Sequence, residues 1–191
     1  MLPNTEWQIK TNEKTIYLTF DDGPTPEVTS WVSDKLEEYE AKATFFCVGD
    51  NVLKYPEIPQ ELKLRGHAIG NHTMHHLSAL QTGWRSYMDD IIAAAPLTST
   101  KLFRPPYGKL TPFHCIALKR MGYKTIMWSF LSYDFDPDIN KEEVIDMMVT
   151  NVKPGSLIIF HDSIKAQKNL SYLLPATLDR LSEKGYSFSP L

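Results

Sequence analysis

Short apolar segments alternate with longer amphipathic segments along most of this 191-residue chain. Most of the apolar segments are rich in β-branched and aromatic residues, which is typical of buried strands. In the amphipathic segments, apolar residues recur every three to four positions, as they do on one face of a helix. Strands are predicted at residues 15–20, 43–48, 67–71, 101–104, 124–130, 156–160 and 186–188, and helices at residues 28–39, 83–95, 112–121, 141–150, 170–184 and, in part, 51–65.

Prolines and one threonine predict where several helices begin and end. Pro56 and Pro59 should break the second helical segment along the chain, and Pro96 should end the third. Thr111 is the expected N-cap of the fourth helix, with Pro112 as its first residue.

This order of elements predicts an α/β protein. Seven strands alternating with six helices favour a parallel sheet wrapped by helices, and right-handed crossovers would curl that sheet into a barrel or leave it as an open doubly wound sheet. The length fits one domain with a substantial core, and no linker or repeat divides it.

Polar and ionisable residues follow five of the predicted strands, at the point where each strand ends. Because the carboxyl ends of parallel strands lie at the same edge of a sheet, these residues should meet on one face, where α/β proteins carry their chemistry. They are Asp21 and Asp22, residues 72–76, residues 104–108, residues 132–136, and His161 with Asp162. The connections at the opposite ends, such as residues 153–155, carry no comparable set.

The net charge of −3 gives no electrostatic reason to expect nucleic acid or an anionic membrane as a partner. No apolar run approaches the roughly 20 residues that a membrane-spanning helix needs. The first residues lack the features of a signal peptide, so the sequence as written predicts a cytoplasmic protein, or one of the cell envelope if an export segment lies outside it. We expect a monomer, with Cys47 and Cys115 unpaired in the core and no role for His67 or His114.

Two histidines and an aspartate form a candidate metal site. His72 and His76 are four residues apart, so on a helical turn both imidazoles would lie on one side and reach one cation. A carboxylate from Asp22 would complete a two-histidine, one-carboxylate set with open coordination positions. Pairing His72 with His75 is a weaker geometric alternative, and all these histidines could instead be polar residues of a surface turn.

Five short motifs occur in an order that resembles a known family. They are TFDDGP (residues 19–24), HTMHH (72–76), RPPYG (104–108), WSFLSYDFD (128–136) and IIFHD (158–162). TFDDGP alone also fits a tight turn, but the ordered set resembles the polysaccharide deacetylases, carbohydrate esterases that remove N- or O-acetyl groups from chitin, peptidoglycan and xylan. The resemblance implies a distorted, incomplete (β/α)7 barrel, with residues 14–191 as the catalytic domain and residues 1–13 as an N-terminal extension.

The same resemblance implies a role for nine residues. Asp22, His72 and His76 would hold one divalent metal, which we expect to be zinc, with cobalt, nickel, manganese or iron as alternatives. The other roles are Asp21 as general base, oriented by Arg104; His161 as general acid, held by Asp134; the backbone N–H of Tyr107 as a donor to the oxyanion; and Phe135 as a wall of the acetyl pocket. Adjacent aspartates would then let one carboxylate fix the metal while the other takes a proton from the water that the metal activates.

The fourth motif departs from the family pattern, which is close to D-[ST]-x-D-W. Leu131 stands where the first Asp is common and Phe135 where Trp is common, whereas Asp134 is kept. The shape and polarity of the acetyl pocket are therefore expected to differ, because a phenyl ring lacks the indole N–H. Tyr107, Trp128 and Tyr133 could stack on sugar rings or belong to the core.

These residues predict a metal-dependent hydrolase that removes N-acetyl groups from an N-acetylglucosamine-containing glycan such as peptidoglycan or chitooligosaccharide. One alternative on the same scaffold is a hydrolase of another acetylated sugar or of a small non-sugar amide. The other is a silent glycan-binding homologue, which would be expected to lack Asp21 or His161, and both are present.

Overall fold

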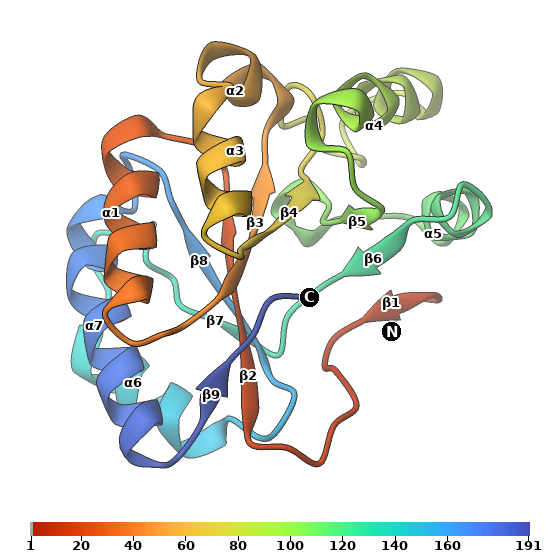
Figure 1. The fold of residues 1–191 in the computed structure, drawn as a ribbon. Coiled ribbons are helices and arrows are strands. Elements are labelled where there is room, and N and C mark those ends of the chain that lie inside the picture. Colours follow the sequence, from red (N-terminus) through yellow and green to blue (C-terminus); the bar gives the residue numbers. More distant parts are fainter. Residues whose placement is uncertain (1) are drawn as a thin grey trace.

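Nine strands form one sheet within residues 2–191, the part of the chain that the computed structural model describes (Figure 1). They are β1 (Thr5–Glu6), β2 (Thr15–Asp21), β3 (Ala43–Cys47), β4 (Ala68–Asn71), β5 (Leu102–Phe103), β6 (Lys124–Ile126), β7 (Phe130–Leu131), β8 (Leu157–His161) and β9 (Ser187–Phe188). Their order is β1-β6-β5-β4-β3-β2-β8-β7, with β9 pairing β2. Every pair of these strands runs parallel.

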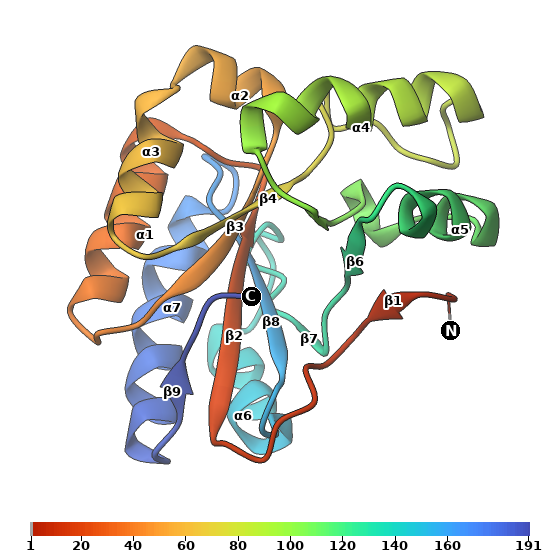
Figure 2. The ribbon, with the colours of Figure 1, turned by 45° about the vertical axis from the view of Figure 1, so that its right-hand side comes forward.

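The sheet curls into a half-barrel with helices around its outer face, and the pair β1 and β6 lies apart from the pair β7 and β8 (Figure 2). The helices are α1 (Pro26–Glu37), α2 (Gly49–Lys54), α3 (Glu57–Leu64), α4 (Trp84–Thr98), α5 (Pro112–Arg120), α6 (Lys141–Asn151) and α7 (Gln167–Glu183), with a 3₁₀ turn at Pro106–Gly108. The predicted α/β fold, a distorted and incomplete barrel in one domain, is confirmed, although it has two strands more than predicted. None of the described helices is long and apolar enough to cross a membrane.

The central strand β2 separates the hydrophobic core from the chemistry. Ile16, Leu18 and Phe20 are fully buried in the main cluster with residues of the covering helices. Phe20 stacks between the rings of Phe45 and Phe160, with centroids 5.0 and 5.7 Å away. Burying such a side chain contributes about 1.5–3 kcal/mol. Since side chains alternate along a strand, the residues between these three face the interior of the half-barrel, where the strand ends with a carboxylate.

The prolines set helix ends less strictly than predicted. Pro56 separates α2 from α3 as expected, but Pro59 lies inside α3 and Pro96 inside α4, so these two predictions were wrong. Pro59 is the third residue of its helix, where the N–H has no intrahelical partner to lose. Pro96 falls in the last turn of α4, and the helix continues to Thr98 before Ser99 turns left-handed at φ 50°. The N-cap at Thr111 is confirmed by its side chain, which accepts a hydrogen bond from the His114 N–H.

One predicted strand was wrong, and one observed strand was not predicted. The apolar segment at residues 124–130 contains not one strand but two, because the chain leaves β6 after Ile126 and joins β8 on the far side of the half-barrel as β7. β1 was not predicted, since it is only two residues long and its pairing partner, β6, lies 120 residues further along the chain. Cys47 and Cys115 are buried and unpaired, as expected.

Candidate active site

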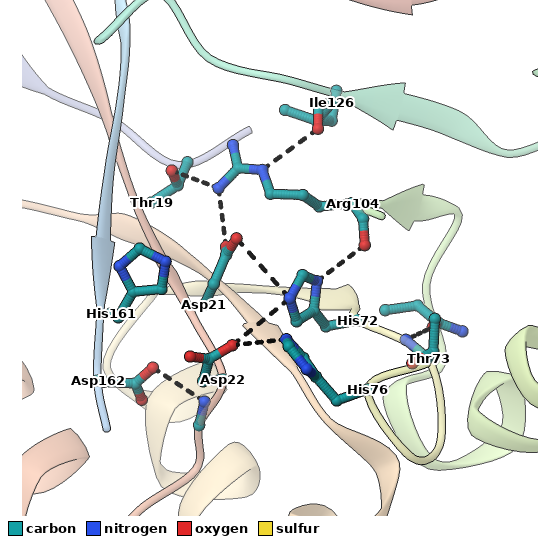
Figure 3. Close-up of polar contacts among 12 residues, drawn as sticks. Thr19, Asp21, Asp22, His72, Thr73, His76, Arg104, Ile126, His161 and Asp162 are labelled. Atoms are coloured by element: carbon teal, nitrogen blue, oxygen red, sulfur yellow. Dashed lines mark hydrogen bonds and ion pairs between the residues drawn. The ribbon is translucent and has the colours of Figure 1, made fainter. Parts of the chain in front are cut away.

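Residues from the carboxyl ends of β2, β4, β5 and β8 surround one pocket of about 710 Å³ (Figure 3). Seven of the nine predicted site residues line it: Asp21, Asp22, His72, His76, Tyr107, Phe135 and His161. The other two, Arg104 and Asp134, lie behind this lining with no exposed surface. The structure therefore brings together all nine residues that the sequence singled out.

Two adjacent aspartates face the same pocket because the strand ends between them. Asp21 is the last residue of β2 and lies beside His161 in the register with β8. Adjacent strand residues normally point to opposite faces of a sheet. Asp22, however, adopts a left-handed φ of 80°, which turns its side chain to the pocket, and its carbonyl accepts a hydrogen bond from the Asn51 amide at 2.8 Å.

Asp22, His72 and His76 present three ligand atoms within 4.8 Å of one another. The Asp22 Oδ1 lies 3.0 Å from Nε2 of His76 and 3.6 Å from Nε2 of His72. Burial by itself would raise the pKa of Asp22, but hydrogen bonds from the two imidazoles outweigh it and hold that pKa well below its usual range. The Nδ1 of His72 lies 2.8 Å from the carbonyl of Arg104, so its Nε2 is left to face the cluster. This donor set fits a divalent cation of the zinc type.

The two histidines reach one side of the pocket through a loop, not through the helical turn that their spacing had suggested. Thr73 and His76 adopt left-handed φ angles of 64° and 56°. Asp90 of α4 fastens this loop: its Oδ2 accepts the N–H groups of Met74 and His75 at 3.0 and 3.1 Å, and its Oδ1 contacts Nδ1 of His75. His75 thus lies on Asp90, with its side chain 56% exposed. Nothing in the sequence singled out Asp90, which lies 14 residues beyond His76 inside an ordinary helix.

Asp21 is held in a fixed orientation by a buried arginine. Its Oδ1 accepts a hydrogen bond from Nη1 of Arg104 at 2.8 Å, and the same nitrogen donates to Thr19 Oγ1 at 2.7 Å. Nε and Nη2 of Arg104 donate to the carbonyls of Ile126 and Met127. Burial lowers the pKa of Arg104, and the Asp21 charge offsets part of that shift.

His161, which is partly buried, and the fully buried Asp134 form a second pair at the pocket. The Oδ1 of Asp134 lies 2.7 Å from Nδ1 of His161, and its Oδ2 accepts the backbone N–H of His161 at the same distance. Burial acts to lower the pKa of His161, but the Asp134 hydrogen bond and charge, with the nearby charges of Asp21 and Asp22, outweigh it and raise that pKa to about 9. The amide of Asn169 donates to the Asp134 carbonyl at 3.0 Å and so ties this loop to α7.

Aromatic residues shape the mouth of the pocket. Tyr107 is 62% exposed, has a φ of 60° and lies edge-on to His76 with ring centroids 4.8 Å apart. Phe135 lies edge-on to His161 at 5.1 Å, and the Lys165 ammonium is 5.3 Å from the centroid of the Phe135 ring. Leu131 also lines the pocket, so this wall is apolar where a carboxylate and an indole would have made it polar.

A further carboxylate, Asp162, follows a strand as the sequence predicted, was given no role there, and supports the turn after β2. Asp162 is buried and accepts the Gly23 N–H at 3.1 Å and the Thr29 hydroxyl at 2.5 Å (Figure 3). A Cβ on Gly23 would lie 2.0 Å from Oδ2 of Asp162, so only glycine allows this approach. Burial raises the pKa of Asp162 to about 7.

The two histidines that were given no role lie away from the pocket. His67 accepts the Ala43 N–H on Nδ1 at 3.2 Å in the core, and His114 belongs to the capping box at the start of α5.

Comparison with known proteins identifies close relatives in sequence and structure. A peptidoglycan-N-acetylglucosamine deacetylase of Bacillus cereus is 34% identical over 188 residues, which cover 95% of this chain and 88% of the relative. A chitooligosaccharide deacetylase of Azorhizobium caulinodans is 31% identical over 207 residues, covering 96% of each chain. The crystal structure of the Bc1960 peptidoglycan N-acetylglucosamine deacetylase, in complex with 4-naphthalen-1-yl-N-oxidanyl-benzamide, superposes with a TM-score of 0.92 at 28% identity, covering 98% of this chain and 91% of that one.

A family model described as polysaccharide deacetylase matches residues 8–126, which is more than half of the chain. The match includes the first three of the five motifs, and the whole-length relatives extend it to the remaining two. The chain belongs to the polysaccharide deacetylases, a family of hydrolases.

Proposed function

We propose that this protein removes N-acetyl groups from an N-acetylglucosamine-containing glycan of the peptidoglycan or chitooligosaccharide kind. The observation that carries the proposal is the pocket that brings a three-residue metal-ligand set together with a buried Asp–Arg pair and a partly buried His–Asp pair. The names of the relatives, at 34% and 31% identity over nearly the whole chain, support the choice of substrate. We propose that the protein acts as a monomer.

Asp22, His72 and His76 would hold one divalent cation, with zinc as the first choice. Such a cation lowers the pKa of a water molecule from about 15.7 to about 7 and polarises a carbonyl oxygen. Two histidines and one carboxylate would leave coordination positions open for water and substrate.

Asp21 accepts the proton of the attacking water. Its Oδ1 is held by Arg104, whereas its Oδ2 lies 3.9 Å from Nε2 of His72, on the side of the cation ligands. A charge-assisted hydrogen bond from a buried guanidinium fixes the carboxylate in place. Positioning of this kind is what proton transfer requires.

His161 donates a proton to the leaving amine. Its Nδ1 is occupied by Asp134, so Nε2 carries the proton that is delivered into the pocket. The backbone N–H of Tyr107 donates a hydrogen bond to the acetyl oxygen as negative charge develops on it. The left-handed φ of Tyr107 sets the direction of that N–H. Phe135 and Leu131 provide the apolar wall for the acetyl methyl group.

Acetate release from N-acetylated chitooligosaccharides and from peptidoglycan, measured with the metal content of the purified protein, tests the proposal. We expect release that stops on adding a chelator and returns with zinc, at about one metal per chain. Small cyclic and formyl amides belong in the same assay, because turnover of those alone would assign the site to a non-sugar substrate. Glycan binding without hydrolysis under zinc, cobalt and nickel would make the protein a silent homologue.

Replacing His76 with Ala is expected to weaken metal binding by more than about 100-fold and to abolish activity with it. Loss of a residue that only hydrogen-bonds to a metal ligand typically lowers metal affinity 10–100-fold. His76 would contribute a ligand atom itself, so its loss should have a larger effect. Titration of the metal-free protein with zinc, followed by calorimetry, measures the effect.

The matched control is His75→Ala, which removes the neighbouring imidazole that lies on Asp90. This variant should bind zinc nearly as the original protein does, since Asp90 still accepts the backbone N–H groups of the loop. The opposite ranking of the two variants would assign the ligand role to the His72 and His75 pair.

A further inference from the structure

The loop between β7 and α6 carries two residues of the site. In the proposed mechanism, Asp134 holds His161 and Phe135 forms a wall of the acetyl pocket. Residues 132–136 belong to no helix or strand, so their backbone groups need partners from elsewhere. Tyr133 has a left-handed φ of 55°, an angle that persists only where surrounding contacts hold it. The contacts that hold this loop therefore also hold two parts of the site.

The first residues of the loop are anchored to the sheet. The N–H of Ser132 donates to the carbonyl of Ile159 in β8 at 3.1 Å, and the hydroxyl of Ser132 accepts the Asp134 N–H at 3.3 Å. Both oxygens of the Asp134 carboxylate are occupied by His161. The carbonyls further along the loop need another partner.

Asn169 of α7 is that partner. The residue is only 5% exposed, and its Nδ2 donates to the carbonyl of Asp134 at 3.0 Å and to the carbonyl of Asp136 at 2.7 Å. An amide nitrogen carries two N–H groups, so both are used. No other described group donates to either carbonyl. Because the two carbonyls lie on either side of Phe135, one amide fixes the backbone before and after this ring.

The segment that contains Asn169 also contacts the Phe135 ring. The Lys165 ammonium lies 5.3 Å from the centroid of that ring, and the ring itself lies edge-on to His161 at 5.1 Å. Lys165 and Asn169 both belong to the stretch of chain that follows β8, whose last residue is His161. The chain that carries the general acid thus also holds the loop that orients it.

A small displacement of this loop would affect two features of the site at once. A carboxylate can orient an imidazole only while its own backbone is fixed, and a misplacement of about 1 Å can cost about 10²-fold in rate. Phe135 shares that backbone, so the width of the acetyl pocket would change as well. Asn169 does not line the pocket, and its effect on the reaction is therefore indirect.

We propose that Asn169 is a positioning residue that fixes the general acid through Asp134 and the acyl-size selectivity through Phe135. This inference rests on the proposed function and deepens it, because it adds to the reaction a residue that lies outside the five motifs. Preference for an acetyl group over a larger acyl group then depends on an amide buried behind the pocket wall.

Turnover of the N-acetyl and N-propionyl forms of the glycan that the wild type accepts tests the inference. Asn169→Leu keeps the approximate size of the side chain and removes both N–H groups. We expect it to lower kcat for acetate release by roughly 10- to 100-fold. The ratio of kcat/KM for the acetyl form to that for the propionyl form should fall by roughly 3- to 10-fold, part of what one methylene is worth in an apolar pocket. Zinc affinity should stay at the wild-type value, since Asn169 contacts none of the three metal-ligand residues.

Asn169→Ser, which is smaller and keeps one O–H donor, is the second variant if leucine prevents folding, and should change kcat and the ratio in the same directions. Asn151→Leu is the matched control. Asn151 is exposed on α6, where its amide donates to the Met147 carbonyl of the same helix at 2.7 Å, and both values should equal those of the wild type.

Two results for the Asn169 variants would overturn the inference and keep the proposed function. One is a wild-type kcat with a wild-type ratio. The other is a lower kcat with an unchanged ratio, which would limit Asn169 to a role in folding stability. No acetate release from any glycan by the wild type would overturn the proposed function and this inference together.

Discussion

Replacing Asp21 with Asn is expected to lower kcat for acetate release by about 10²–10⁴-fold while the metal stays bound. The amide oxygen of Asn can still accept the hydrogen bond from Arg104 Nη1, so the geometry behind the pocket is kept. The amide cannot take a proton from water, however, and proton transfer by a positioned base is worth about that factor. Asp21 shares no ligand atom with the three-residue metal set, and metal content should therefore be unaffected.

The adjacent aspartate provides the comparison. Asp22→Asn removes a charged ligand, so we expect loss of metal together with loss of activity. Metal stoichiometry and kcat, measured on both variants after the same zinc loading, separate a base from a ligand. Loss of metal from Asp21→Asn with retention in Asp22→Asn would mean that the two roles are exchanged. Full activity of Asp21→Asn would remove the general base from the mechanism.

Stability must be measured on the same variants because Asp21 and Arg104 are a buried ion pair. Leaving one partner of such a pair unpaired typically costs 3–5 kcal/mol. Asn should avoid most of this cost, since it remains a hydrogen-bond acceptor, whereas Asp21→Ala should not. A thermal midpoint of Asp21→Asn close to that of the wild type would assign its loss of activity to chemistry and not to folding.

The sequence alone predicted the face on which the site lies. Parallel strands end at one edge, so the order of polar residues after each strand was enough to bring Asp21, His72 and His161 together. The same logic extended to Arg104, which follows β5 and reaches back across the interior to Asp21. These predictions depend on topology, which the alternation of apolar segments specifies well.

Local backbone geometry was not predictable in the same way. The spacing of His72 and His76 fits a helical turn, but the loop achieves the convergence with two left-handed residues. The left-handed φ of Asp22 likewise decides that adjacent carboxylates share a pocket. Such angles are costly for residues other than glycine and persist only where tertiary contacts hold them. For the histidine loop, the contact is Asp90, which reads in the sequence as a polar residue of a helix surface.

The barrel edges escaped prediction for a related reason. A two-residue strand such as β1 carries no periodic signal, and it exists because its partner β6 lies at an edge of the sheet. The apolar segment at residues 124–130 reads as one continuous strand, yet its first half pairs with β5 and its last residue with β8.

Replacing Asp134 with Asn is expected to shift the alkaline limb of the pH–kcat profile to lower pH and to cut kcat at pH 8 by about 10²-fold or more. A general acid must carry its proton before it can donate it. In the wild type, burial lowers the pKa of His161, but Asp134, aided by the charges of Asp21 and Asp22, outweighs burial and raises that pKa to about 9. Without the Asp134 charge, burial dominates, so the pKa falls and His161 loses its proton at a lower pH.

Two comparisons isolate this effect. Asp138→Asn changes an exposed carboxylate four residues further along the same loop and should leave the profile in place. An aryl acetate, whose leaving group needs no proton, should lose far less activity in Asp134→Asn than the N-acetyl sugar does, because the general acid matters only for the poor amine leaving group. Equal losses on both substrates, with an unshifted alkaline limb, would assign Asp134 a purely structural role through its hydrogen bond to the His161 backbone.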